Sequence, residues 1–179
     1  MYRMLWGSVY TAGCIILVAN RIKDYKHARK GLGLICILYF ASAIYITCIR
    51  GNRSGLGGFS FRFPLPFLKA ILKHHYGTTT NRSLLNVILF VPFGYLLPAF
   101  YSSFKDRGSA DTKYDFNWWM TTASGFFFSL LIETAQLVLK IGVFELDDLV
   151  KNTMGAAAGW LIWKLLGKTS DNLPKEDKN

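Results

Sequence analysis

The sequence predicts an all-α membrane protein, folded as a bundle of about five transmembrane helices with one short helix at the membrane surface. Three properties support this fold class: 51% of the 179 residues are apolar, only 18% are charged, and the mean hydropathy is +0.24. Charge-free runs recur along the chain, each near the ~20 residues that a helix needs to cross a bilayer. These properties argue against a soluble single domain and exclude disordered, collagen-like and disulfide-rich proteins.

Five apolar segments define one transmembrane domain, residues 1–167, followed by a polar tail, residues 168–179. The first three segments lack charge, the fourth contains Glu133, and the fifth carries Lys151 and Lys164 near its ends, from which an ammonium group can reach the interface. The first segment has no convincing small-x-small cleavage site, so we expect it to be retained. The predicted helices cover residues 4–20, 31–49, 84–101, 117–139 and 149–167.

The charges of the connectors predict the orientation in the membrane. Residues 21–30 hold five basic residues and one acid, which is typical of a cytoplasmic loop. Five crossings then place the N-terminus and the connectors 50–83 and 140–148 outside the cell, with the tail in the cytoplasm. The connector 50–83 argues the other way, because it has six basic residues and no acid. The net charge of +10 indicates orientation and contact with anionic lipids, and no nucleic-acid-binding motif is present.

Residues 67–73 predict a short helix that lies in the membrane interface. Pro66 suits the first turn of such a helix, its apolar side chains share one face, and Lys69 and Lys73 share another. The segment is either an anchor on the lipid surface or part of a clamp for an anionic headgroup. The clamp would add three neighbouring residues, His74, His75 and Arg82.

The fourth segment carries an unusual acid. A carboxylate at the centre of a membrane helix costs about 2.5 to 3.5 kcal/mol, so Glu133 requires a partner or a function. Ser129 and Gln136 lie on the same stripe of the helix, at spacings of i, i+4 and i+7. We therefore expect this stripe to face protein or water and not lipid.

One narrow face of the fifth segment carries polar residues at its outer end and small residues along the rest of its length. Asp148 and Asn152 lie at the polar end, and Gly155 and Gly159 form a GxxxG segment that lets another helix approach closely. Acidic residues cluster at the start of this helix, where free amide groups favour negative charge. These are Glu145, Asp147 and Asp148.

The third segment contains Asn86 near its outer end and Pro92 at membrane depth. Proline removes one helical hydrogen bond, and a carbonyl freed inside a bilayer must find a protein or water partner. We expect Asn86, Glu133 or Gln136 to supply that partner.

Three segments resemble the VanZ-like family of bacterial membrane proteins. Residues 86–98 are similar to the family's Asn-x-x-x-Phe-x-Pro-x-Gly stretch, residues 133–136 to its Glu-x-x-Gln, and residues 147–155 to its Asp-Asp-x-x-x-Asn-Thr-x-Gly. The family's Arg shortly before the acidic pair is replaced here by Ile-Gly-Val at 141–143, and its Asn-Leu-Ile-Pro-Phe stretch appears as Phe-Pro-Leu-Pro-Phe at 63–67. The resemblance implies a multi-pass cell-membrane protein, related to one that lowers sensitivity to the glycopeptide teicoplanin.

The first functional hypothesis is an outward-facing polar pocket that binds a lipid-linked cell-wall precursor or the lipid tail of a lipoglycopeptide. Arg82 is a candidate for the charge of the missing Arg. No metal, cofactor or nucleic-acid partner is predicted, and membrane lipids are the expected surroundings. The candidate binding residues are Asn86, Glu133, Gln136, Asp147, Asp148, Asn152 and Arg82.

Two other hypotheses remain open. In the first, the protein is an enzyme that acts on a phosphorylated or acylated lipid. Glu133 and Asp148 are its candidate catalytic residues, and Asp147 and Asp148 would hold a magnesium ion. No nucleophile with an adjacent His supports this. Alternatively the polar residues only join helices, through interhelical hydrogen bonds worth about 0.6 to 2 kcal/mol each.

Overall fold

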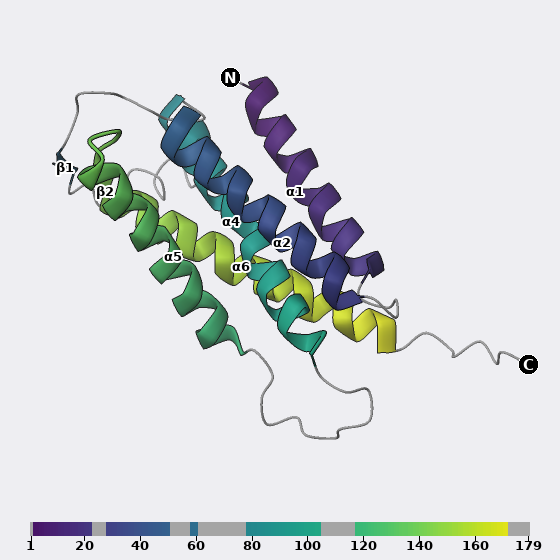
Figure 1. Ribbon diagram of the computed structural model, residues 1–179. Coiled ribbons are helices and arrows are strands. Elements are labelled where there is room, and N and C mark those ends of the chain that lie inside the picture. Colours follow the sequence, from purple (N-terminus) through teal and green to yellow (C-terminus); the bar gives the residue numbers. More distant parts are fainter. Residues whose placement is uncertain (1, 23–27, 51–57, 61–77, 105–116, 172–179) are drawn as a thin grey trace, which may run out of the picture.

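The computed structural model describes residues 2–22, 28–50, 58–60, 78–104 and 117–171 (Figure 1). These residues form five α-helices, one π-helical turn and two very short strands, which confirms the all-α fold class. The elements are α1 (Tyr2–Ile22), α2 (Ala28–Ile44), η1 (Tyr45–Arg50), β1 (Phe59–Ser60), α4 (Thr78–Ser102), α5 (Trp118–Val138), β2 (Phe144–Glu145) and α6 (Leu146–Asp171).

The five predicted helices are all present, with differences at their ends. The second predicted helix is divided, because its last turn widens from α2 into the π-helical η1. α4 begins at Thr78, earlier than predicted, and α6 continues to Asp171, so the first residues of the predicted tail are helical. The predicted interfacial helix 67–73 and the rest of the tail lie outside the described residues.

Two of the described helical segments are long and apolar enough to cross a membrane. They are Arg29–Thr47, with a mean hydropathy of 1.6, and Ser83–Ser102, with a mean hydropathy of 1.8. Within the described part of the chain, α1, α5 and α6 do not meet the same criterion, so five crossings are not confirmed.

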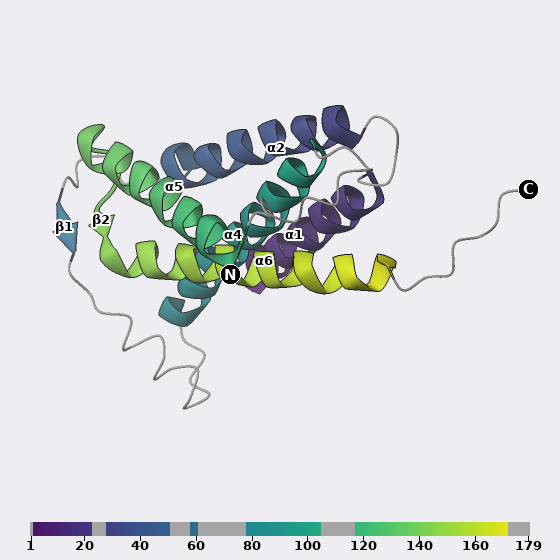
Figure 2. The same cartoon turned by 90° about the horizontal axis from the view of Figure 1, so that it is seen from below.

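The α4 and α6 helices form the most extensive helix pair, and glycines allow their close approach. A Cβ atom at Gly94 would overlap the backbone of Ala156, and one at Gly155 would overlap the carbonyl of Val87. A Cβ atom at Gly159 would meet the carbonyl oxygen of Val91 in the same way. The prediction that the GxxxG segment is a close-packing surface is therefore confirmed. Figure 2 shows α6 along one side of the bundle and α2 along the opposite side.

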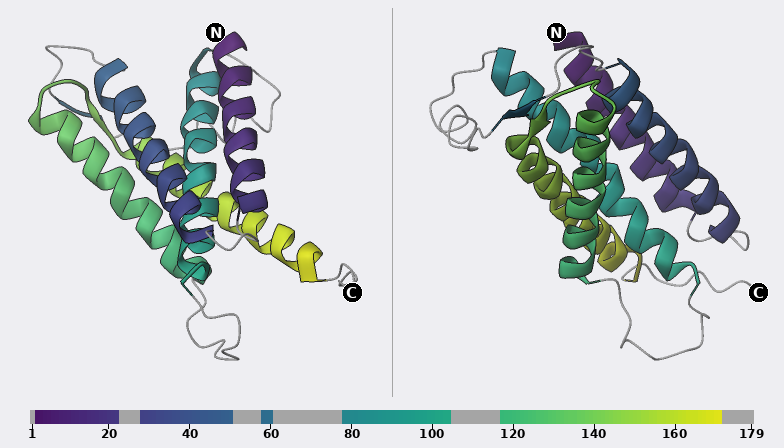
Figure 3. Two further views of the ribbon diagram at one scale, coloured as in Figure 1. Left: turned by 45° about the vertical axis from the view of Figure 1, so that its right-hand side comes forward. Right: turned by 60° about the vertical axis from the view of Figure 1, so that its left-hand side comes forward.

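Aromatic rings fill the space between α2, α4 and α5. Phe93 of α4 stacks on Phe128 of α5, with ring centroids 5.3 Å apart and planes 11° apart. Phe40 of α2 meets both rings edge-on. α1 completes the bundle by lying against α4 (Figure 3), where the Tyr95 hydroxyl donates a hydrogen bond to Asn20 Oδ1 over 3.0 Å.

Pro92 lacks the amide hydrogen that would bind the carbonyl of Ile88, and the next carbonyl along α4, that of Leu89, is bound by a residue that the sequence did not single out. The hydroxyl of Tyr39, in α2, donates a hydrogen bond to the carbonyl of Leu89 over 2.7 Å, within the turn of α4 that precedes the proline. The described hydrogen bonds of Glu133 and Gln136 go to the Glu145 amide and the Thr47 carbonyl, so their predicted role as partners of the freed carbonyl is not confirmed. Asn86 makes no hydrogen bond to any other described residue.

A two-residue parallel strand pair was not predicted. Phe59 of β1 pairs with Phe144 of β2, and Ser60 pairs with Glu145. The pair joins the connector after η1 to the loop between α5 and α6, so the two connectors meet at the same end of the bundle (Figure 1).

Candidate functional site

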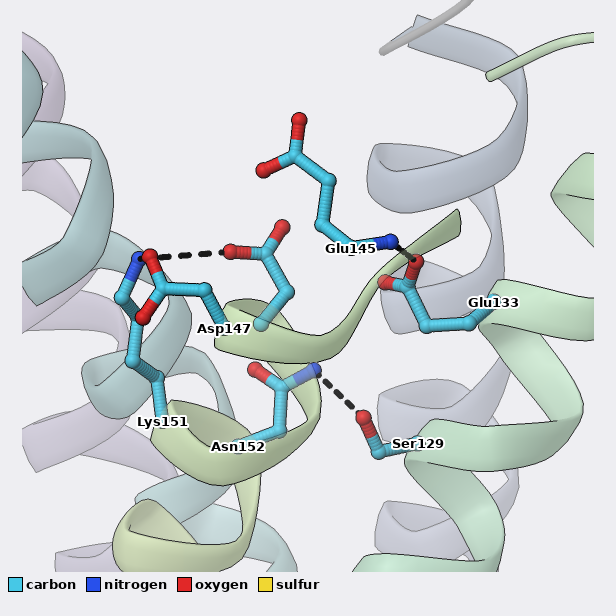
Figure 4. A network of polar contacts seen from close by, with 7 residues as sticks. Ser129, Glu133, Glu145, Asp147, Lys151 and Asn152 are labelled. Atoms are coloured by element: carbon cyan, nitrogen blue, oxygen red, sulfur yellow. Dashed lines mark hydrogen bonds and ion pairs between the residues drawn. The ribbon is translucent and has the colours of Figure 1, made fainter. Parts of the chain in front are cut away.

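The candidate site lies where α5 ends and α6 begins, and a tight reversal of the chain builds it. Lys140 follows the last turn of α5 with φ of 53°, the left-handed conformation that often ends a helix. The amide of Ile141 then donates to the carbonyl of Gln136 over 3.0 Å, which closes the end of the helix. The chain passes through β2 and enters α6 at once, so the first turn of α6 lies beside the last turns of α5 (Figure 4).

Glu133 faces the protein interior, as its stripe predicted. The residue is 3% exposed, and its Oε2 accepts a hydrogen bond from the backbone amide of Glu145 over 2.9 Å. That amide belongs to β2, directly before α6. The carboxylate therefore holds the start of α6 against α5.

The acidic first turn of α6 is paired with a buried lysine. Lys151 is 4% exposed, and its Nζ contacts Asp147 Oδ2 and lies 3.4 Å from Asp148 Oδ1. Its ammonium group turns back toward the start of α6, where both aspartates precede the predicted span, and the expectation that it reaches the interface stays a prediction. The spacings of Lys151 from Asp148 (i+3) and Asp147 (i+4) could have predicted this pairing from the sequence.

Asp148 lies before the predicted span 149–167, in the first turn of α6. Burial raises the pKa of its carboxyl group, and the nearby ammonium of Lys151 opposes that effect. The carboxylates of Glu145 and Asp147 raise the pKa further. The first turn of α6 is thus a place where negative charge is crowded.

Two hydrogen bonds tie α5 to its neighbours. Asn152 Nδ2 of α6 donates to Ser129 Oγ over 2.8 Å, and both residues are buried. Gln136 Nε2 donates to the carbonyl of Thr47, in the π-helical η1, over 3.0 Å. These contacts show that part of the predicted site also joins helices.

Two buried acceptor atoms in this region lack a hydrogen-bond partner among the described residues. They are Asp147 Oδ1 and Asn152 Oδ1. Buried polar atoms are nearly always hydrogen-bonded in folded proteins, so each such atom calls for a partner such as a water molecule, an ion or a ligand. Both atoms are acceptors, so their partner must be a hydrogen-bond donor or a cation.

The structure brings most of the predicted residues together, but not all. We define the polar cluster as Ser129, Glu133, Glu145, Asp147, Asp148, Lys151 and Asn152, most of which Figure 4 labels. Gln136 binds η1 beside this cluster, and Asn86, on α4, makes no described hydrogen bond to it. Arg82 lies in α4, and its side chain is outside the described part. Three members of the polar cluster were not among the predicted site residues: Ser129, Glu145 and Lys151.

The polar cluster offers no described metal site. Among the described residues, no group of three or more His, Cys, Asp and Glu side chains is arranged to hold a metal ion. Asp147 and Asp148, the residues considered for magnesium, both contact Lys151.

Comparison with known proteins identifies the family of the chain. The model of the VanZ/LLP1 family matches residues 32–167, which include α4, α5, most of α6 and the whole polar cluster. No curated protein and no solved structure matches the chain. The matched residues make up more than half of the sequence and contain all three segments on which the resemblance was based. The chain therefore belongs to the VanZ/LLP1 family.

Proposed function

We propose that this protein is an integral membrane protein that contributes to glycopeptide resistance. In this proposal it has five crossings and an outward-facing polar site at the α5–α6 junction, which binds a lipid-linked cell-wall precursor or the lipid tail of a lipoglycopeptide. Its family is consistent with a VanZ-type role in resistance. Two helices of suitable length and hydropathy support a membrane location.

The observation that carries the proposal is the group of polar side chains around the contact between Glu133 of α5 and the start of α6. A buried carboxylate, a buried ammonium group and two acceptors that have no partner in the described part of the chain gather within a few turns of one helix junction. Helix packing alone is achieved more simply by small and apolar residues, as α4 and α6 show at Gly94 and Gly155. Charged groups withdrawn from water in a membrane protein generally mark a functional site.

The end of the bundle at which the two connectors meet supports the outward orientation of the polar cluster. The β1–β2 pair lies at the same end as the polar cluster, because β2 leads directly into α6. The last turn of α1 and the first turn of α2, which flank the basic residues 21–30 of the sequence, lie at the opposite end of the bundle from the β1–β2 pair (Figure 1). If that loop is cytoplasmic, as its charge predicts, the polar cluster faces the outer leaflet.

A second candidate function is purely structural, and two contacts favour it. The Asn152–Ser129 and Gln136–Thr47 hydrogen bonds connect α5 to α6 and to η1. In this alternative the family's polar residues maintain the bundle and bind no ligand.

The substitution Glu133→Gln separates the two functions. The amide oxygen of Gln can still accept the Glu145 amide hydrogen, so the loop contact is retained while the negative charge is lost. The experiment compares a deletion strain complemented with the wild type, Glu133→Gln or the control Thr122→Val, whose hydroxyl is buried and unpartnered among the described residues, outside the polar cluster. The measurements are teicoplanin susceptibility, binding of labelled drug to cells, and the amount and melting temperature of the protein in membranes.

The ligand-binding proposal expects Glu133→Gln to reach wild-type amount and melting temperature but to lose resistance, while Thr122→Val retains it. Loss of Glu133→Gln from the membrane supports the structural alternative. Equal susceptibility and equal drug binding with and without the wild-type protein overturn the proposed role in resistance.

A further inference from the structure

Three helices meet at the end of the bundle opposite the polar cluster. The last turn of α1 packs on the first turn of α2, where a Cβ atom at Gly31 would lie 2.7 Å from a side-chain carbon of Ile22. The start of α2 also packs on the end of α4, where a Cβ atom at Gly33 would lie 3.4 Å from the ring of Phe100. Figure 1 shows these three helix ends away from β1 and β2.

An arginine at this meeting point is held by an aromatic ring. The guanidinium carbon of Arg29, in the first turn of α2, lies 5.3 Å from the centroid of the Phe104 ring, two residues after α4. This cation–π contact uses the charge of the guanidinium group and none of its N–H donors. Arg29 is exposed and forms no hydrogen bond or ion pair with a described residue. An acceptor from outside the chain can therefore reach its donors.

The neighbouring sequence makes this region positively charged. Lys30 is exposed beside Arg29, and Arg21 is exposed in the last turn of α1. Residues 21–30 contain five basic residues and one acid, and residues 105–116, which follow Phe104, contain three of each. The two segments together hold eight basic and four acidic residues, a net charge of +4. We call this region the basic corner and define it by Arg21, Arg29, Lys30 and Phe104.

The exposed face of α2 continues from the basic corner as an apolar strip. Leu34, Ile37 and Leu38 follow Lys30 at spacings of four, seven and eight residues, which places them on one face of the helix. They are 58%, 67% and 59% exposed, in a segment that is long and apolar enough to cross a membrane. Such a face meets acyl chains. Cations at the end of an apolar strip fit an amphipathic lipid, whereas a free phosphate ion gains nothing from the strip.

We infer that the basic corner binds an anionic phospholipid. Its phosphate accepts hydrogen bonds from Arg29 and Lys30, and its acyl chains lie along Leu34 and Ile37. A zwitterionic lipid brings its own cation, so it compensates less of the positive charge of the basic corner. The inference goes beyond the proposed function, and it requires only that α2 crosses a membrane.

Substitutions that each remove one contact test the site. Arg29→Gln and Lys30→Gln each remove one positive charge, and Phe104→Leu removes the aromatic ring without changing the charge. Lys164→Gln is the matched control, because Lys164 is also exposed and its ammonium group lies 4.9 Å from the centroid of the Trp160 ring. It belongs to α6, which runs along the side of the bundle opposite α2 (Figure 2).

The full-length protein is measured in nanodiscs that contain equal amounts of phosphatidylglycerol and phosphatidylcholine with the same acyl chains. Native mass spectrometry identifies the lipids that the protein retains when the nanodisc is removed. In a second series, soluble glycerol phosphate is added at the concentration of phosphatidylglycerol, as a competitor that has the phosphate but no acyl chain. Melting temperatures confirm that each variant is folded.

We expect the wild type to retain phosphatidylglycerol in preference to phosphatidylcholine, with no effect of glycerol phosphate. The loss of one basic side chain near an anionic headgroup predicts about fivefold weaker retention for Arg29→Gln and for Lys30→Gln. The loss of the cation–π contact predicts about twofold weaker retention for Phe104→Leu. Lys164→Gln should retain phosphatidylglycerol like the wild type.

Four results would overturn the inference. They are equal retention of the two lipids by the wild type, displacement of the lipid by glycerol phosphate, wild-type retention by Arg29→Gln, Lys30→Gln or Phe104→Leu, and a loss in Lys164→Gln as large as that in Arg29→Gln. The last result would indicate a uniform basic surface in place of a site.

These outcomes are independent of the resistance assay, because the basic corner and the polar cluster lie at opposite ends of the bundle. If lipid selectivity is absent but resistance still requires Glu133, the proposed function stands and the lipid site falls. If Arg29 and Lys30 select the anionic lipid but susceptibility to teicoplanin does not depend on the protein, the lipid site stands and the role in resistance falls.

Discussion

The substitution Gly94→Ala tests whether close contact between α4 and α6 holds the bundle together. An added Cβ atom would overlap the carbonyl of Ala156, which is helix backbone and cannot move aside as a flexible side chain can. The two helices must separate along the surface that also contains Gly155 and Gly159. Overpacking of this kind destabilises proteins by about 1 to 3 kcal/mol, and a backbone obstacle predicts the upper end, about 3 kcal/mol.

The assay is thermal unfolding of the purified protein in one detergent. For a chain of this length, a loss of about 3 kcal/mol lowers the melting temperature by roughly 6 to 12 °C. The matched control is Gly13→Ala in α1, because a Cβ atom there meets nothing within 4 Å. That control should melt at or slightly above the wild-type temperature, since alanine favours helix by about 0.8 to 1 kcal/mol over glycine. A Gly94→Ala protein that melts like the wild type would refute the close-packing argument.

Three further predictions use the same unfolding assay. Lys140→Gly should stabilise the protein by about 1 kcal/mol, because glycine adopts φ of 53° without the steric penalty of a side chain, and Lys140→Ala should show no such gain. Tyr39→Phe should destabilise it by about 1 to 3 kcal/mol, because it removes the donor to the Leu89 carbonyl, and an unchanged free energy of unfolding would contradict that role. Ser129→Ala and Asn152→Ala, alone and together, should show a coupling energy of about 0.6 to 1.7 kcal/mol, and additive effects would indicate that their hydrogen bond contributes nothing.

The sequence predicted the helices well because charge-free runs and polar connectors are local signals. It also predicted that Glu133 faces inward and that Gly155 and Gly159 allow close packing, since helical spacing places these residues on defined faces. These inferences depend only on the helical period within one segment of the sequence.

Features that depend on two distant segments were not predictable in the same way. The hydroxyl of Tyr39 supports Leu89 across a separation of 50 residues, and nothing in a single sequence marks that pairing. The β1–β2 pair joins residues far apart in the chain through two positions each, too few to produce a recognisable strand pattern. The pairing of Lys151 with Asp147 and Asp148 was not predicted, although the i+4 and i+3 spacings within α6 were a local signal for it.

The packing residues and the polar residues of the family motifs depend on one another. Gly94, Gly155 and Gly159 fix the position of α6 along α4. That position determines which turns of α5 lie beside the first turn of α6. A displacement of α6 by one helical turn, about 5.4 Å, would break both the 2.9 Å contact of Glu133 with the Glu145 amide and the 2.8 Å contact of Asn152 with Ser129. The glycines therefore act on the polar cluster without touching a ligand. A glycine substitution that leaves the protein folded should therefore weaken both contacts through displacement of α6, whereas Ser129→Ala removes one of them with the helix positions unchanged.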